Sequence, residues 1–234
     1  MFGRPTEVIT SARAEVTNAF MRGVYVWMAI GLAVTAFCSY VTLSSNAALS
    51  FIFGNKMIFF GLIIAELGIV IALSAAVHKL SSFAATGMFI LYSVLNGITL
   101  SAVLLVYTSQ SVFTAFLTTA GMFGAMSLYG LVTKRDLTSM GSFMTMGLFG
   151  IIIAMVVNIF VGSSALDMGI SILGVFIFLG LTAYDTQALR NMGETAPMDD
   201  ALAIRRGTIM GALKLYLDFI NIFLMLLRLF GDRR

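Results

Sequence analysis

Near its C-terminal end the chain reads Leu215-Tyr216-Leu217-Asp218-Phe219-Ile220-Asn221-Ile222-Phe223, an apolar stretch with an acidic residue inside it. An earlier stretch, Leu181-Thr182-Ala183-Tyr184-Asp185-Thr186-Gln187, has the same character. Both belong to apolar segments long enough to cross a bilayer. A carboxylate in such a segment costs roughly 3 kcal/mol on insertion scales, so it usually faces the protein interior and marks a functional site. The two stretches therefore predict one shared site on two consecutive helices.

The composition places the chain among membrane proteins. Of its 234 residues, 59% are hydrophobic and 11% are charged, against roughly 25% charged residues in an average soluble domain. Apolar runs of about 20 residues recur along the chain, which predicts an all-α membrane protein. The formal charge is +3, but the basic residues stand at the ends of the apolar runs instead of forming a patch with interleaved aromatics. We therefore expect a lipid bilayer as partner and no nucleic acid.

Seven membrane-spanning helices are predicted when about 20 apolar residues are allowed for each crossing. They are Gly23 to Ser44, Met57 to Val77, Phe83 to Tyr107, Val112 to Val132, Ser142 to Gly162, Met168 to Ala188, and Thr208 to Phe230. No soluble domain fits between them, so residues 1–234 are expected to form a single polytopic domain. Its polar N-terminal segment, residues 1–22, shows no cleavable signal peptide. The first span is therefore expected to act as the insertion signal.

Lysine and arginine in the short loops predict that the N-terminus lies inside. On that assumption the outer loops hold Lys56, and most other basic loop residues lie inside. The tail conflicts with this rule, because Arg228, Arg233 and Arg234 would lie outside if the last segment crosses fully. We expect a full crossing, since early helices usually set the topology. A partial span with its tail inside is the alternative.

The last segment carries a polar stripe along one face. Its members follow the spacing i, i+4, i+7, i+11 and i+14, and they are Lys214, Asp218, Asn221, Met225 and Arg228. A polar stripe within a membrane must be shielded by protein or water. The C-terminal helix is therefore predicted to be central, with the other six around it. A simpler interpretation is an i, i+4 ion pair between Lys214 and Asp218 at the helix entrance, which leaves Asp185 unexplained.

Asp185 and Asp218 are predicted to form a pH-sensitive gate. With the N-terminus inside, both carboxylates fall in the inner part of the membrane. Two carboxylates a few ångströms apart in a low dielectric cannot easily both be ionised, so they share a proton. We hypothesise that this proton holds the two helices together, and that its loss separates them and exposes oxygen ligands to a cation. Calcium suits such a transient site because it accepts carboxylate and carbonyl oxygens in flexible geometry.

Other polar residues inside the spans have two interpretations each. Glu66, near the middle of the second segment, is either a pore-lining, ion-binding group or a protonated acid hydrogen-bonded to a neighbouring helix. Asn96 and Asn158 are expected to form interhelical hydrogen bonds. His78 and Lys79, at an inner helix end, are expected to anchor the helix at the interface, with a gating role for His78 as the alternative.

Small residues spaced four apart predict close helix contacts at three places. They are Gly121 and Ala125, Gly150 and Ala154, and Gly207 and Gly211. The single cysteine, Cys38, can form no intramolecular disulfide and is expected to be a small buried side chain.

The two aspartate stretches together resemble the C-terminal signature of the transmembrane Bax-inhibitor-motif family. Ala65-Glu66-Leu67-Gly68 and Met126-Ser127-Leu128-Tyr129-Gly130 are similar to further segments of that family. The similarity covers essentially the whole chain and is greatest to bacterial members. The resemblance implies seven helices with the last enclosed by the other six, in a bacterial inner membrane with a cytoplasmic N-terminus.

The function implied by the resemblance is a pH-sensitive, calcium-permeable leak channel. Asp185 and Asp218 match the paired aspartates that regulate it, and Glu66 matches an acidic position associated with the pore. Supporting roles are expected for four neighbouring residues, Tyr184, Lys214, Tyr216 and Asn221. A basic partner near the end of the second helix is not assigned to His78 or Lys79. Bacterial relatives without the aspartate pair are associated with modulating a membrane-bound quality-control protease, so a non-conducting interaction protein is the alternative.

An enzyme is not expected. Tyr184-Asp185 matches the first motif of intramembrane aspartyl proteases, but Tyr216 and Leu217 stand before Asp218 where those enzymes have glycines, and no Pro-Ala-Leu element follows. One histidine and one cysteine leave no zinc site of the usual ligand types and no histidine–cysteine dyad. No phosphate-binding glycine loop occurs, so no cofactor is expected beyond a permeant calcium ion. Proton-coupled transport of an organic substrate would require broken helices at the midplane, of which the sequence shows little sign.

Overall fold

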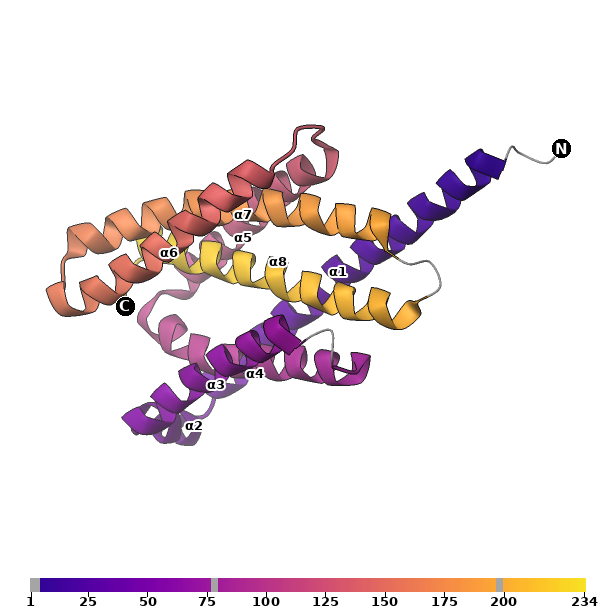
Figure 1. Cartoon of the computed structure of the whole chain (residues 1–234). Coiled ribbons are helices and arrows are strands. Elements are labelled where there is room, and N and C mark those ends of the chain that lie inside the picture. The colour runs from indigo at the N-terminus through magenta and orange to yellow at the C-terminus, as the bar shows by residue number, and fades with distance from the viewer. Residues whose placement is uncertain (1–4, 77–79, 197–199) are drawn as a thin grey trace. The chain divides into compact units, whose positions relative to one another are not determined.

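The computed structural model describes residues 5–76, 80–196 and 200–234, and within these it is helical without a named strand (Figure 1). Its helices are α1 Pro5–Leu43, α2 Asn46–Phe53, α3 Lys56–Ala76, α4 Ser82–Val106, α5 Ser109–Val132, α6 Thr138–Val161, α7 Ser164–Thr195 and α8 Ala201–Phe230. In the described part of the chain, seven of them are long and apolar enough to cross a membrane. The predicted fold class, an all-α membrane protein with seven spans, is confirmed.

Helix α2 was not predicted. It lies in the connection between the first two spans, and the side chain of Ser45 accepts a hydrogen bond from the Ala48 N–H at 3.2 Å, which caps its first turn. Its 8 residues correspond to about 12 Å of helix, against about 30 Å for the hydrocarbon core of a bilayer. A search for membrane spans cannot find a helix of this length.

Helices α1 and α7 extend further than the predicted spans. α1 begins at Pro5 instead of Gly23, and α7 continues to Thr195 instead of ending at Ala188. The hydropathy of a segment reports the part that crosses the membrane, whereas a helix can continue into water wherever polar residues favour it. The predicted bounds therefore describe the crossings and underestimate the helices.

The described chain forms two compact units, and both α7 and α8 contribute to each. Unit 1 comprises residues 1–106 and 189–216, and unit 2 comprises residues 107–188 and 217–234. The end of α7 and the first half of α8 thus belong to unit 1, while the rest of both helices belongs to unit 2.

In unit 1, α4 packs against both α1 and α3. The contact with α1 is closest at Gly97, where a Cβ would lie 2.5 Å from the carbonyl oxygen of Thr35. Ser39 Oγ donates to the Gly97 carbonyl at 2.7 Å across the same contact. The end of α7 and the first half of α8 meet at Gly211, where a Cβ would lie 2.6 Å from a methyl carbon of Leu189. Small residues thus let these helices approach closely.

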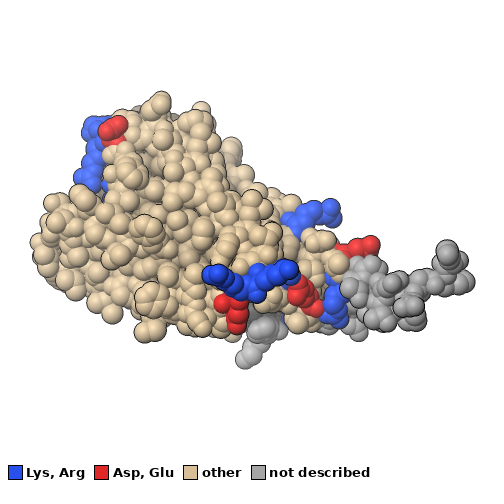
Figure 2. Space-filling view, turned by 90° about the horizontal axis from the view of Figure 1, so that it is seen from above, with Lys and Arg blue, Asp and Glu red and all other residues tan. Residues whose placement is uncertain are grey.

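Helix α8 is the most buried of the spans. Its apolar window is 72% buried, compared with 6% in α3 and in α6. This is what the prediction of a central C-terminal helix requires. The lipid-facing surface is apolar, with Phe83 87% exposed and Phe160 85% exposed. On the face shown in Figure 2, charged side chains cover only small areas.

Only one of the three predicted small-residue contacts is present. Gly207 and Gly211 pack against neighbouring side chains, whereas a Cβ at Gly121 or Gly150 would meet no described atom within 4 Å. The spacing of four identifies one face of a helix. It does not tell whether protein or lipid covers that face.

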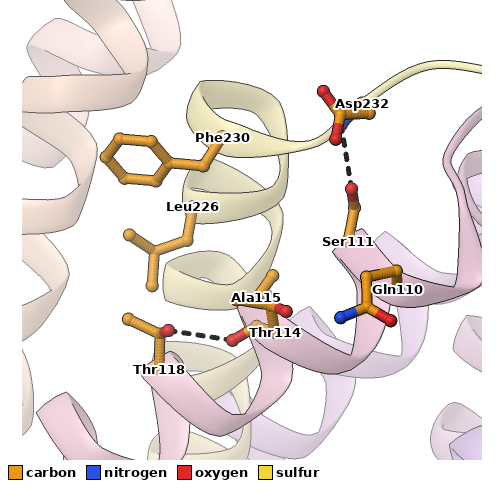
Figure 3. Close-up of a pocket in the computed structure, with 8 residues that line it drawn as sticks. All are labelled: Gln110, Ser111, Thr114, Ala115, Thr118, Leu226, Phe230 and Asp232. Atoms are coloured by element: carbon orange, nitrogen blue, oxygen red, sulfur yellow. Dashed lines mark hydrogen bonds between the residues drawn. The ribbon is translucent and has the colours of Figure 1, made fainter.

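The C-terminal tail is fixed to the start of α5 within unit 2. The Thr108 N–H donates to the Asp232 carbonyl at 3.0 Å. The Asp232 N–H donates to Ser111 Oγ at 2.9 Å (Figure 3). Ser111 and Asp232 line a pocket of about 410 Å³ between α5 and the end of α8. Since α8 is continuous to Phe230 and its tail meets the first residues of α5, these contacts support a full crossing by the last span.

Candidate functional site

The residues on both sides of Asp185 fix α7 against α5 and α6. A Cβ at Gly130 of α5 would lie 2.4 Å from the Ala183 carbonyl oxygen, and one at Gly141 of α6 would lie 2.4 Å from the ring of Tyr184. Each glycine therefore leaves the space that α7 occupies. The ring of Tyr184 covers Gly141, and its supporting role at the aspartate site stays a prediction.

Gln187 joins α7 to the connection between α5 and α6. Its Oε1 accepts a hydrogen bond from the Leu137 N–H at 2.9 Å, and its Nε2 donates to the Arg135 carbonyl at 2.8 Å. Between these two residues, Asp136 Oδ1 accepts from the N–H and the hydroxyl of Thr138 at 2.9 and 2.6 Å. These hydrogen bonds hold the pKa of the exposed Asp136 carboxyl below its usual value. Gln187 thereby fixes α7 two residues beyond Asp185.

Helices α7 and α8 pack antiparallel within unit 2. Near the start of α7, Asp167 Oδ1 accepts a hydrogen bond from Arg228 of α8 at 3.0 Å. Two turns further along α7, a Cβ at Gly174 would lie 3.0 Å from the sulfur of Met225. From the first contact to the second, the residue number rises from 167 to 174 on α7 and falls from 228 to 225 on α8. The two helices therefore run in opposite directions. These two contacts set the register between the helices.

Both aspartates lie on the helix faces that make these contacts. Successive residues of a helix turn by about 100°, so Asp185 lies about 20° from Gly174 around α7. By the same count Asp218 lies about 20° from Met225 around α8. Met225 and Arg228 belong to the polar stripe predicted for the last span. That stripe therefore faces α7 in unit 2.

The register also places the two aspartates at similar depths. Asp185 follows Gly174 by 11 residues, and Asp218 precedes Met225 by 7 residues in the same spatial direction. Counted from Gly174 and Met225, the difference of 4 residues corresponds to about 6 Å along the axis. Counted from Asp167 and the long side chain of Arg228, the difference is 8 residues, or about 12 Å. Asp218 is only 5% exposed, and Asp185 is partly exposed. This placement supports the pairing of the two carboxyl groups, which stays a prediction.

The other residues singled out in the sequence have different surroundings. Lys214 is exposed, and Asn221 donates to the Leu217 carbonyl of its own helix at 2.8 Å. Tyr216 is fully buried in unit 1, with its ring edge-on to those of Phe89 and Tyr92. His78 and Lys79 lie outside the described residues.

Glu66 is held by α4 within unit 1. Thr99 Oγ1 donates to Glu66 Oε1, and Asn96 Nδ2 donates to Glu66 Oε2 at 3.4 Å. The opposite face of α3 is covered by no protein, since Ile64 is 69% exposed. Glu66 is thus hydrogen-bonded to a neighbouring helix, as one of its two interpretations expected. Its protonation and its pore-lining role stay predictions.

The two mid-span asparagines differ. Asn96 forms the predicted interhelical hydrogen bonds, because it also accepts from the Tyr216 hydroxyl of α8 at 3.0 Å. For Asn158 the prediction is wrong: its Oδ1 accepts from the Ser163 N–H at 2.9 Å and closes the end of its own helix. Gly162 makes this possible, since its φ of 66° lies in the left-handed region that favours glycine. Thr99, which the sequence analysis missed, follows Asn96 by three residues and so shares its helix face.

Comparison with known proteins decides the family. The family model described as Inhibitor of apoptosis-promoting Bax1 matches residues 17–234, which include both aspartate stretches. The chain belongs to the Bax-inhibitor family. Within the Bax-inhibitor family it is similar to the inner membrane protein YbhL of Escherichia coli K12, at 51% identity over 93% of each chain. It is also 48% identical to an uncharacterized protein of Borreliella burgdorferi, over 97% of this chain and 98% of that one.

A further Bax-inhibitor relative is an uncharacterized protein of Deinococcus radiodurans, which is 46% identical over 92% of this chain and 91% of its own. These relatives match nearly the whole length of the chain. The chain is therefore an integral membrane protein of bacterial type, in agreement with the predicted resemblance.

Proposed function

We propose that this member of the Bax-inhibitor family is a pH-sensitive, calcium-permeable leak channel gated by Asp185 and Asp218. The observation that supports the proposal is the antiparallel packing of α7 and α8, from which we infer that both aspartates lie on facing sides of these helices, one to two turns apart in depth. A bacterial inner membrane with the N-terminus in the cytoplasm is the proposed location, since the E. coli relative is named an inner membrane protein.

The chemistry of the gate follows from the proximity of two carboxyl groups. At a separation of about 5 Å and an effective dielectric constant of about 20, two carboxylates repel each other by about 3 kcal/mol. One shared proton removes this repulsion, because the protonated carboxyl donates a hydrogen bond to the ionised one. Acidic conditions thus favour packed helices, and loss of the proton favours their separation.

The packing indicates which contact gives way. Gly130, Gly141 and Gln187 fix α7 on its faces toward α5, α6 and their connection. On the face toward α8, the register rests on the flexible side chain of Met225 and on the half-exposed ion pair between Asp167 and Arg228. Methionine repacks easily and an exposed ion pair contributes little. We therefore expect α7 and α8 to separate while α7 stays attached to α5 and α6.

Calcium is the proposed permeant ion, and no resident metal is proposed. In the described part of the chain, no group of three or more His, Cys, Asp and Glu side chains could hold a metal ion. A calcium ion at Asp185 and Asp218 would therefore complete its shell with carbonyl oxygens or water, as calcium readily does. Such an incomplete site suits brief occupancy during passage.

The test is calcium flux into proteoliposomes that contain only the purified full-length protein and an enclosed calcium indicator. We expect flux that rises from acidic to alkaline pH and that loses this dependence in Asp185→Asn and Asp218→Asn. Asp136→Asn, an exposed position outside the spans, is the matched control and should behave as the wild type. Absence of flux at every pH would overturn the channel and leave a non-conducting interaction protein, whose partner could be a membrane-bound protease.

A further inference from the structure

A chain of polar contacts runs from Glu66 across unit 1. It passes from the Glu66 carboxyl to the Asn96 amide at 3.4 Å, and from that amide to the Tyr216 hydroxyl at 3.0 Å. The Tyr216 hydroxyl meets Thr35 Oγ1 at 2.6 Å, and Thr35 Oγ1 meets the Ser93 carbonyl at 2.9 Å. The chain thereby links α3, α4, α8 and α1. Its far end is fully enclosed, since Tyr216 is 0% and Thr35 2% exposed.

The protons in this chain of hydrogen bonds can be counted from the end at Ser93. The Ser93 carbonyl can only accept, so Thr35 must donate its one hydroxyl proton there. Thr35 Oγ1 must then accept in its 2.6 Å contact with Tyr216, which uses the one proton of the tyrosine. The Tyr216 oxygen, in turn, needs a donor from Asn96. The count therefore requires the NH₂ group of Asn96 to face Tyr216, which is the reverse of the orientation given above, in which Asn96 Oδ1 accepts from Tyr216.

This orientation of Asn96 determines the state of Glu66. If the Asn96 NH₂ group faces Tyr216, then Asn96 Oδ1 faces Glu66, and two oxygens can form a hydrogen bond only when a proton lies between them. The amide nitrogen and oxygen of asparagine are interchangeable by a half-turn of the side chain. Only a protonated Glu66 thus gives every contact of the chain its own proton. With an ionised Glu66, the NH₂ group must turn to the carboxylate and Tyr216 donates to Asn96. The single proton of Thr35 must then serve both Tyr216 and the Ser93 carbonyl, so one of these two contacts lacks a proton.

We propose that Glu66 is a buried proton-binding site, and that Asn96 and Tyr216 are positioning residues that retain its proton. Binding of the proton completes the chain of hydrogen bonds from α3 to α1. Its release rotates the Asn96 amide and leaves Thr35 with one proton for its two contacts, with Tyr216 and with the Ser93 carbonyl. The ligand is a proton, and the acceptor atom is Glu66 Oε2. The second oxygen, Oε1, keeps its hydrogen bond from Thr99 in both states.

The surroundings of Glu66 favour the neutral form. The titratable side chains near this chain of hydrogen bonds are Tyr92 on α4, Tyr216 on α8 and Cys38 on α1. All three are neutral at physiological pH. Within the described residues no cation forms an ion pair with Glu66. An ionised carboxylate next to lipid would therefore lack a compensating charge. All of these contacts lie within unit 1, and proton binding at Glu66 does not depend on calcium conduction.

The proposal is tested by infrared spectroscopy of the full-length protein in nanodiscs during a pH titration. The titration uses protein that also carries Asp185→Asn and Asp218→Asn, because a proton shared by that pair would add a second carboxyl band. We expect a protonated carboxyl band at neutral pH that is absent when Glu66→Gln is added. Tyr216→Phe deprives the Asn96 NH₂ group of its acceptor and lets it turn to the carboxylate. The midpoint of the band should then fall by about one pH unit, the equivalent of one net hydrogen bond.

Matched variants separate this effect from general damage. Thr35→Val should lower the midpoint, Thr35→Ser should restore it because the hydroxyl is kept, and Tyr40→Phe on the exposed face of α1 should leave it unchanged. The proposal is overturned if Glu66→Gln leaves the band in place, or if folded Tyr216→Phe and Thr35→Val proteins titrate as the wild type. Because the infrared band reports the protonation of Glu66, the outcome of this experiment is independent of whether calcium flux is observed.

Discussion

Unit 1 and unit 2 place acidic side chains inside their spans in different ways. Glu66 in unit 1 lies on the little-buried helix α3 and is held by hydrogen bonds from Thr99 and Asn96. Asp185 and Asp218 in unit 2 lie on helices whose register is set by packing at Gly174 and Met225. On our proposals, Glu66 keeps a proton of its own among neutral hydrogen-bond partners. Asp185 and Asp218 would instead share one proton between two helices, which would make them sensitive to helix separation.

The largest expected difference between the two regions is in the response of calcium flux to pH. Asn at position 185 or 218 removes the charge that repels its partner, so flux should lose a dependence of up to about tenfold per pH unit. Glu66→Gln mimics the protonated acid, because its NH₂ group can donate to Asn96 and its oxygen can accept from Thr99. We expect this variant to keep the wild-type response. If Glu66→Gln abolished the response and Asp218→Asn did not, the assignment of roles would be reversed.

The next effect tests whether glycine contacts fix α7. In Gly130→Ala the new methyl group would lie 2.4 Å from the Ala183 carbonyl oxygen, so the backbones must move apart at a cost of about 1–3 kcal/mol. Gly121→Ala, on the same helix, meets no described atom within 4 Å and should stabilise α5 by up to about 1 kcal/mol. Thermal unfolding in detergent should therefore shift in opposite directions for the two variants. Equal shifts would contradict the close contact between α5 and α7.

A smaller effect is expected at Gln187. Leucine at this position removes the acceptor for the Leu137 N–H and the donor to the Arg135 carbonyl, with an expected loss of about 1–2 kcal/mol in unfolding free energy. Gln187→Glu keeps the acceptor but sets a buried carboxylate oxygen against the Arg135 carbonyl, so at neutral pH it should lose at least as much. Both are measured by the same unfolding experiment at neutral pH. A leucine variant as stable as the wild type would show that Gln187 of α7 does not stabilise the connection between α5 and α6.

The smallest effect belongs to Asp136. Its pKa lies below the usual value because Thr138 donates two hydrogen bonds to the carboxylate. The folded protein therefore binds this proton more weakly than the unfolded chain, and the stabilisation is present above the ordinary pKa and is lost as pH falls through the folded one. Asp136→Asn should reduce the difference in stability between neutral and acidic pH. An unchanged difference would show that these hydrogen bonds do not favour the charged form.

The sequence predicted the spans and their apolar character well, because about 20 consecutive apolar residues have few other structural solutions. It also predicted the polar stripe of α8, since the spacing of Asp218, Met225 and Arg228 fixes a helix face without knowledge of its neighbours. The two aspartates could also be singled out, because a carboxylate within an apolar run is conspicuous whatever the helix packs against.

Features that depend on what a helix meets could not be predicted. Gly121 and Gly130 lie on one helix, yet only Gly130 contacts another helix, and nothing in their spacing separates them. Asn158 closes its own helix while Asn96 joins three helices, although both are amides within a span. The hydroxyl of Thr35 gave no signal, because threonine is common in membrane helices as a partner of its own backbone.

The central claim, that Asp185 and Asp218 act as one site, is tested most directly by a double-mutant cycle on the pH midpoint of calcium flux. Sites that share a proton are strongly non-additive. We predict that Asp185→Asn and Asp218→Asn each abolish the pH response and that the double variant shows no further change. Independent, additive shifts from the two single variants would contradict a shared site.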